Sequence, residues 1–237
     1  MHPIVVNVDP ELKPTNIVRR YLDLPKFLDM LLTSSLYLRR ADSFTDRFEG
    51  ALTPAFRRAI DDGHLKGDLK HDAEYFYRRA RVGSFVSCWS LGAKDNMALW
   101  QLYGGVTTSV AITTTIERLI KVAKRWNEPT LLHKVEYIDH SKNPDMVIGQ
   151  YTDVLRFKNE AYEYEKEIRV IVPRQSKDWE KNPDGIRLFV DDLNALLRSV
   201  VVSPEAQPWF VELTQDVCSR YNISAPVRRS KLAFLPK

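Results

Sequence analysis

Residues 162–172, with the sequence YEYEKEIRVIV, contain the strand pattern that decides the fold class. We expect a strand over 163–172 that ends at Pro173, which cannot donate a backbone hydrogen bond to a neighbouring strand. Successive side chains of a strand point to opposite faces. One face therefore carries the charged residues Glu165, Glu167 and Arg169. The other face carries the apolar residues Ile168, Val170 and Val172.

The two carboxylates of this strand are the first candidate site. Same-face positions of a strand are roughly 6.6–6.8 Å apart, so Glu165 and Glu167 could divide a chemical task. One would accept a hydrogen bond from a hydroxyl while the other stabilises developing positive charge. The alternative is a solvated face with a Glu–Arg pair, which would contribute at most about 1 kcal/mol to stability. Spacing alone favours the solvated face and leaves the paired-carboxylate interpretation as the alternative.

The rest of the chain mixes helices and strands without a strict β-α-β alternation, which indicates an α+β fold. We expect a mixed, mostly antiparallel sheet with helices packed around it, in a single domain over 1–237 because no linker is visible. Further strands are predicted over 35–39, 84–90, 109–115, 133–138, 187–190, 200–202 and 227–232. Helices are predicted over 24–32, 53–61, 72–82, 116–126, 145–161, 191–198 and 204–221. Asp95 is the expected N-cap of one more helix, which Gly104 and Gly105 would end.

Composition and charge are those of an ordinary globular protein. Of 237 residues, 44% are hydrophobic and 28% charged, which argues against disorder. Lys plus Arg is 35 and Asp plus Glu is 31, so the net charge is 35 − 31 = +4, too small for a dedicated nucleic-acid binder. The first residues do not resemble a secretory signal, and no apolar run approaches the roughly 20 residues of a membrane span. We therefore expect a soluble, cytoplasmic protein without a membrane partner.

Several common chemistries have no support in the sequence. The chain lacks a phosphate-binding GxxxxGK[ST] loop, a GxGxxG fingerprint, a GxSxG nucleophile elbow and HExxH. Its five histidines share no metal-ligand spacing, so no metal is predicted. Two cysteines exclude a disulfide scaffold. Cys88 lies in the 84–90 strand, where a buried inert thiol is the favoured interpretation and a nucleophile the alternative.

Two more clusters are candidates for a pocket. The first is residues 43–49, SFTDRFE, where helix capping is the structural alternative. The second combines the 84–90 strand with Met97, Trp100 and Tyr103, which are at helical spacing and in that pattern more often form a core than line a pocket. The pocket candidates outside the carboxylate pair are Phe44, Asp46, Phe48, Glu49 and Arg169.

These motifs, taken together, resemble an uncharacterised and mostly bacterial family, the domain of unknown function 2971. The matches cover most of the chain, and Thr45 and Arg47 depart from the family's Phe-Asn-Asp-Pro-Phe-Glu box. In chain order they are the Arg20-Tyr21 pair, the 26–31 helix, the 36–38 strand, FTDRFE at 44–49, CWS at 88–90 with Met97, Trp100, Tyr103 and Gly105, YEKEIR at 164–169, VSP at 202–204, and Val227 with Ser230. The family name carries no function.

A more distant resemblance does imply one. A strand with Arg20, a helix, a strand, the serine-containing 84–90 strand and a strand with Glu-x-Glu occur in the order of ADP-ribosyltransferases of the Arg–Ser–Glu type. The resemblance implies a split sheet, NAD as substrate and the second Glu of the pair as the catalytic one.

Carried over residue by residue, the resemblance assigns each motif a role. Arg20, with Tyr21 beside it, would contact the NAD phosphates or ribose, and Ser87 or Ser90 would hold the middle-strand position. Glu165 would face the acceptor and Glu167 the nicotinamide ribose hydroxyl. The aromatic residues that could stack on nicotinamide or adenine are Trp89, Trp100 and Tyr103.

The first functional hypothesis is therefore an NAD-consuming ADP-ribosyltransferase or NAD glycohydrolase, with a toxin or phage-defence effector as its biological setting and an unknown acceptor. The second is a non-enzymatic nucleotide-sensing or binding module, in which Glu165 and Glu167 only anchor structure through Arg47 or Arg169. The third is a metal-dependent nuclease or RNA-binding protein that uses the carboxylates together with the basic segments 78–81 and 228–231.

Overall fold

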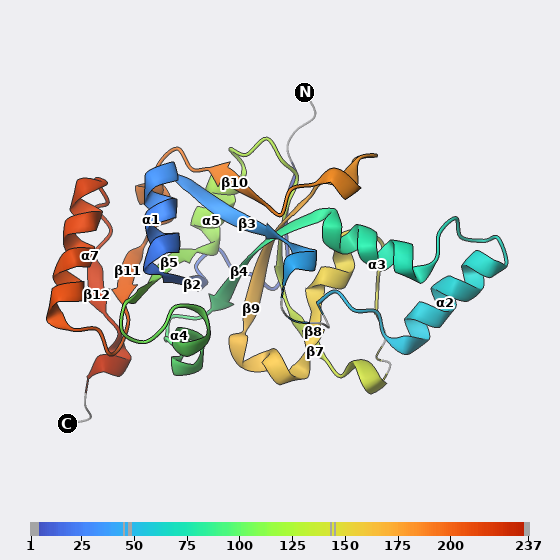
Figure 1. The fold of residues 1–237 in the computed structure, drawn as a ribbon, viewed down its shortest axis with the longest axis horizontal. Coiled ribbons are helices and arrows are strands. Elements are labelled where there is room, and N and C mark those ends of the chain that lie inside the picture. The colour runs from blue at the N-terminus through green and yellow to red at the C-terminus, as the bar shows by residue number, and fades with distance from the viewer. Residues whose placement is uncertain (1–4, 45, 47–48, 143, 145, 235–237) are drawn as a thin grey trace.

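The fold is built on one large sheet (Figure 1). The computed structural model describes residues 5–44, 46, 49–142, 144 and 146–234. Within these residues ten strands join in the order β1-β6-β9-β4-β2-β5-β11-β12, and β3 pairs with both β4 and β10. Their bounds are β1 Val6–Val8, β2 Ile17–Asp23, β3 Ser35–Arg40, β4 Ser84–Leu91, β5 Ser109–Thr115, β6 Thr130–Lys134, β9 Glu167–Pro173, β10 Gly185–Phe189, β11 Ser199–Val202 and β12 Val227–Arg229.

Strand pairing confirms an α+β fold with a mixed, mostly antiparallel sheet. β1 with β6 and β11 with β12 are the parallel pairs of the large sheet, and its other pairs are antiparallel. A second, parallel pair joins β7 (Glu136–Ile138) to β8 (Phe157–Asn159). The α-helices are α1 Leu24–Thr33, α2 Pro54–Leu65, α3 Ala73–Val82, α4 Met97–Tyr103, α5 Ile116–Ala123, α6 Leu193–Leu196 and α7 Pro208–Arg220.

The sheet separates one large core from two smaller ones. Ile168, Val170 and Val172 of β9 belong to the large core, together with residues of α1, α5, α6 and α7. On the opposite face Ile171 packs with α3, while Trp100 of α4 packs in a separate cluster. The alternation predicted for this strand is therefore confirmed from Glu167 onward, with the charged residues opposite the large core.

Helix ends follow local capping chemistry. Asp23 accepts the Lys26 N–H at the start of α1, and Pro25 occupies the first turn as predicted. At α4 the predicted cap is wrong, because Asn96 rather than Asp95 accepts the Ala98 N–H. The Asp95 carboxylate instead accepts a hydrogen bond from Ser230, which ties the end of the chain to this loop.

The segment before β9 departs from the prediction. The helix expected over 145–161 is wrong, since 3-10 turns at Tyr151–Arg156 and Glu160–Glu165 flank β8 there, and Asp145 lies outside the described residues. The strand expected from 163 begins only at Glu167. Lys166 adopts a left-handed conformation, with φ of 47°, and its N–H bonds to the Glu163 carbonyl. That turn ends the 3-10 helix and redirects the chain into the sheet.

One weak seam in the sheet positions the site. β2 pairs with β4 through only two residue pairs, Val18 with Leu91 and Arg19 with Ser90. Beyond Arg19, β2 continues alongside β5, while β4 continues alongside β9. The two strands therefore part, and the space between them is available to side chains.

Candidate functional site

A cleft of about 590 Å³ lies where β2 and β4 part. Arg20 shares its strand face with Val18 and Leu22 of the large core, yet it lines the same cleft as Glu167 from the opposite face of β9. The parting of the strands brings the two together. The predicted site residues that line the cleft are Arg20, Tyr21, Phe44, Asp46, Glu49, Trp89, Ser90, Tyr103, Glu165, Glu167 and Arg169.

Three predicted residues are not among them. Phe48, with its neighbours Thr45 and Arg47, lies outside the described residues. Ser87 does not line the cleft, because its side chain is buried and its hydroxyl accepts the Trp89 indole N–H at 3.1 Å. Of the two serines proposed for the middle strand, Ser90 is therefore the one at the cleft, and its hydroxyl donates to the Glu165 carbonyl at 2.8 Å.

Trp100 is a core residue rather than a ligand-stacking one. It is fully buried, and its ring meets that of Tyr21 edge to face with 4.9 Å between centroids. The prediction that Trp100 lies on a helix was correct, but its side chain packs in a core cluster and does not line the cleft. Tyr103, at the last position of the same helix, does reach the cleft.

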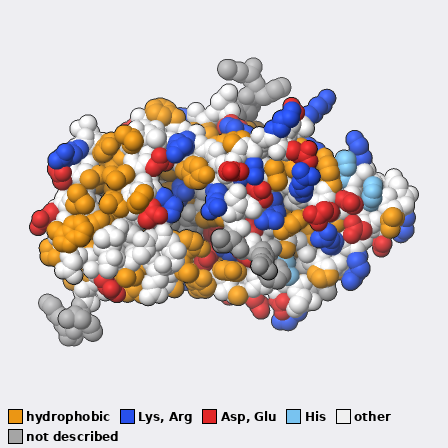
Figure 2. Space-filling model, in the orientation of Figure 1, with side chains coloured by type: hydrophobic (Ala, Val, Ile, Leu, Met, Phe, Trp, Pro, Cys, Tyr) orange, Lys and Arg blue, Asp and Glu red, His pale blue; other side chains and the backbone are white. Residues whose placement is uncertain are grey.

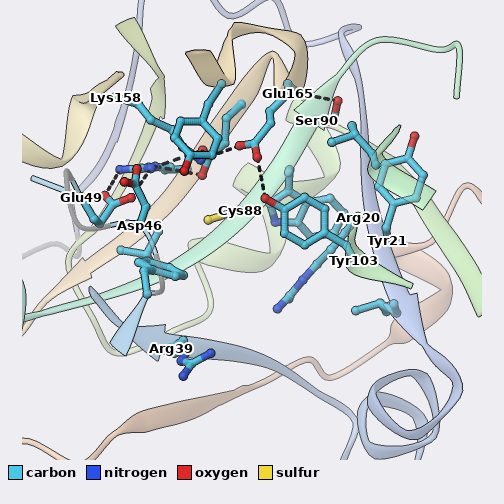
Figure 3. A pocket seen from close by; sticks show the side chains of 18 of the residues that line it. Arg20, Tyr21, Arg39, Asp46, Glu49, Cys88, Ser90, Tyr103, Lys158 and Glu165 are labelled. Carbon is cyan, nitrogen blue, oxygen red and sulfur yellow. Dashed lines mark hydrogen bonds and ion pairs between the residues drawn. The ribbon is translucent and has the colours of Figure 1, made fainter. Parts of the chain in front are cut away.

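Lys158 organises the acidic side of the cleft. From β8 its ammonium group donates to Glu165 Oε2 and, at 3.0 Å, to Glu167 Oε2 (Figure 3). All three side chains are buried. No sequence pattern predicted Lys158 as a site residue, because a lysine seven and nine positions before two acids has no recognisable spacing signature.

Arg169 extends this network on the far side of Glu167. Its Nε donates to Glu167 Oε1 at 2.9 Å, and its Nη2 donates to Glu49 Oε2 at 2.8 Å. Nη1 contacts the other Glu49 oxygen and the Leu155 carbonyl. A fully buried guanidinium is stable only when its donors are matched in this way. The pairing of Glu167 with Arg169 agrees with the anchoring role that the binding-module hypothesis gave to this arginine.

The two cations keep Glu167 ionised. Desolvation by itself would raise the pKa of Glu167, but Arg169 and Lys158 outweigh it and lower that pKa to about 2. For Glu49 desolvation is the stronger influence, and its pKa is raised despite Arg169. At neutral pH the cleft thus contains a fixed carboxylate at 167 with a defined orientation.

Cys88 is a poor nucleophile in this setting. Burial, followed by the charge of Glu167, raises its pKa well above the ordinary thiol value. Only the thiolate is reactive, and at neutral pH this thiol stays protonated. The geometry therefore favours the inert interpretation of Cys88.

The opposite wall of the cleft is basic. The Arg20 guanidinium donates to the Tyr37 carbonyl at 3.0 Å and lies 6.0 Å from the centroid of the Trp89 ring. Arg39, an exposed residue of β3, lines the same wall. Lys and Arg side chains gather in the middle of this face of the molecule, whereas apolar side chains gather over α1 and α7 (Figure 2). The cleft therefore has Arg20 and Arg39 on one side and Glu165 and Glu167, with their own partners Lys158 and Arg169, on the other.

The basic segment 78–81 is engaged in local contacts. Arg78 forms an ion pair with Glu180 at 2.9 Å, and Arg79 and Arg81 donate to Tyr75 and Tyr77 on their own helix. These contacts favour a structural role over phosphate binding for this segment.

In the part of the chain that the structure describes, no group of three or more His, Cys, Asp or Glu side chains is placed to hold a metal ion. Across those same residues, no helix has the length and apolar character needed to span a membrane.

Comparison with protein-family models, with curated proteins and with solved structures finds no match to this chain. Both resemblances noted in the sequence therefore stay predictions. Fold and cleft together define an α+β protein with a charged cleft at a seam of its sheet.

Proposed function

We propose that this protein binds NAD in the cleft and breaks its nicotinamide–ribose bond, as an ADP-ribosyltransferase or an NAD glycohydrolase. One observation carries the proposal: Arg20 and the Glu165–Glu167 pair, which come from two separate motifs, line a single cleft. The parting of β2 from β4 at the same place supports a split sheet of the kind that the resemblance implies.

The charges suit the reaction. Cleavage breaks the bond between ribose and the nicotinamide nitrogen, and the electron pair leaves with nicotinamide and neutralises its ring charge. The ribose carbon becomes cationic until water or an acceptor attacks it and loses a proton. An ionised carboxylate fixed beside that carbon stabilises the cation without reorganising. Glu167, with its pKa lowered to about 2, meets this requirement at neutral pH.

The basic wall suits the rest of the ligand. NAD carries a diphosphate, and a guanidinium binds phosphate oxygens through charge-assisted hydrogen bonds. Arg20 and Arg39 both line the cleft and supply this chemistry opposite the carboxylates.

The test is nicotinamide release from NAD by the full chain. We expect release by the wild type and a loss of at least a hundredfold in Glu167→Gln. Glu163→Gln is the matched control, because Glu163 is exposed on the turn just before the strand. Equal rates in Glu167→Gln and wild type would remove Glu167 from the reaction.

A second candidate, a nucleotide-binding module without turnover, is favoured by one specific observation. The Glu165 and Glu167 carboxylates already accept hydrogen bonds from Lys158 and Arg169, and the Glu167 side chain is only 4% exposed. Ligand binding without nicotinamide release would select this candidate. A thermal-shift series with NAD and ADP-ribose measures the binding, because a ligand that binds only the folded state raises Tm.

The metal-dependent nuclease is the candidate that the geometry favours least. Its carboxylates would have to bind a divalent cation, but Lys158 and Arg169 already occupy the positions beside Glu165, Glu167 and Glu49.

A further inference from the structure

A hydrogen bond joins two of the residues that line the cleft. Tyr103, at the end of α4, donates its hydroxyl to Glu165 Oε1 at 2.6 Å. The two side chains come from separate elements. Tyr103 is the last residue of α4, which packs on β2, whereas Glu165 ends the 3-10 turn that precedes β9. Figure 3 shows them pointing toward each other across the cleft.

The four oxygens of the carboxylate pair differ in the donors that hold them. Both Glu167 oxygens accept from Lys158 or Arg169, and both of those donors are buried. Glu165 Oε2 also accepts from Lys158. Glu165 Oε1 accepts from Tyr103, which is 47% exposed. Among the described residues, Glu165 Oε1 is therefore the oxygen of the pair whose donor can leave without being buried unsatisfied.

We infer that Glu165 is the carboxylate that accepts a hydrogen bond from a ligand hydroxyl, and that the Tyr103 hydroxyl occupies the place of that group until the ligand binds. The inference rests on the proposed function for its ligand class, a nucleotide with a free ribose hydroxyl. It gives Glu165 the ribose contact, whereas the resemblance assigned that contact to Glu167.

The exchange conserves hydrogen bonds. A ribose hydroxyl and a phenol hydroxyl each donate one proton, so Glu165 keeps its partner while Tyr103 turns to water. Lys158 holds the second oxygen throughout and preserves the orientation of the carboxylate. Desolvation and then the bond to Glu165 raise the pKa of Tyr103, so the phenol is protonated and able to donate at neutral pH.

Glycine follows Tyr103 directly, which fits a side chain at a tight turn. Gly105 has φ of +83°, and a Cβ at Gly104 would lie 2.9 Å from the Ser109 side chain. The turn holds the end of α4 against β5 and presents Tyr103 to the cleft.

Isothermal titration of the full chain with ADP-ribose tests the inference, because ADP-ribose has the ribose hydroxyls but no nicotinamide bond to break. Without the competing phenol, Tyr103→Phe should bind ADP-ribose on the order of tenfold more tightly than the wild type. Glu165→Gln should bind on the order of tenfold more weakly. In the double variant the gain from Tyr103→Phe should vanish, because its target carboxylate is gone.

Tyr164→Phe is the matched control. Tyr164 is 40% exposed and adjoins Glu165, but its side chain does not line the cleft. The Tyr164→Phe variant should therefore bind ADP-ribose with the affinity of the wild type. Equal or weaker binding by Tyr103→Phe overturns the inference. A gain that persists in the double variant overturns it as well, and so does the absence of ADP-ribose binding in every variant.

Nicotinamide release separates this inference from the proposed function. The expected affinities without any release of nicotinamide would remove the enzyme and keep the ligand contact of Glu165. Release by the wild type with unchanged affinity in Tyr103→Phe would keep the enzyme and remove the exchange.

Discussion

The Arg169 guanidinium donates hydrogen bonds from both of its terminal nitrogens to the Glu49 carboxylate, although 120 positions separate the two residues. Both side chains are almost completely buried. This pair joins the segment before α2 to the middle of β9, and both residues line the cleft. Fold stability and the charge of the site therefore depend on the same contacts.

Replacing Arg169 should cost much of the protein's stability. Arg169→Met leaves Glu49 and Glu167 buried without their shared cation, and such a change costs about 3–5 kcal/mol. Chemical denaturation with a constant m-value measures the loss. Arg187→Met is the control, because its ion pair with Asp29 is exposed and surface ion pairs contribute little to stability. Similar losses in both variants would contradict a buried network.

The acid stability of the protein should reflect Glu167. Its pKa falls from 4.5 in the unfolded chain to about 2 in the folded one, so the folded state binds fewer protons. The stabilisation is complete above pH 4.5 and is lost as the pH falls toward 2. A shift of this size corresponds to roughly 3 kcal/mol.

The measurement for this prediction is the free energy of unfolding between pH 5 and pH 2 in wild type and Glu167→Gln. The wild type should lose more of this free energy than the variant as the pH falls. Glu49 contributes with the opposite sign in both proteins, because its raised pKa favours the folded state at low pH. Parallel curves would show that Glu167 is not held ionised by its partners.

Replacing Trp100 should destabilise the core and leave the affinity for ADP-ribose unchanged. Trp100→Ala empties a fully buried position and should cost about 3–5 kcal/mol of unfolding free energy. Trp209→Ala, at a position 55% exposed on α7, should change it by less than about 1 kcal/mol. The milder Trp100→Phe should keep the protein folded for titration with ADP-ribose. A tenfold loss of affinity in that variant would show that Trp100 contributes to ligand binding.

Arg20 should supply binding energy to an anionic ligand. Arg20→Met removes charge-assisted hydrogen bonds to phosphate, so affinity for ADP-ribose should fall roughly ten- to a hundredfold. Arg187→Met again serves as the control, since Arg187 is exposed outside the cleft. Equal affinities in Arg20→Met and wild type would place the phosphates elsewhere.

Local patterns correctly predicted the elements in which consecutive residues share the same propensity for strand or helix. The β-branched run Ser109–Thr115 forms a strand with the predicted bounds, and α1 begins at Leu24 as expected from Pro25. The helix predicted through residues 146–161 and the strand predicted at 163–166 were wrong, because the conformation of these residues depends on distant contacts. Val154 and Leu155 pack against Ile171, and β8 exists only through its pairing with β7.

By itself the sequence determined the alternation of β9 and the α+β class, because these follow from the local period of side chains along the backbone. Its motifs also indicated eleven of the described residues that line the cleft. Tertiary structure alone decided that Lys158 bridges Glu165 and Glu167, that Arg169 binds Glu49, and that Ser87 and Trp100 face away from the cleft. The reason is physical: a strand or helix pattern specifies which side chains share a face, but what covers that face depends on where β2 and β4 part and on the left-handed turn at Lys166.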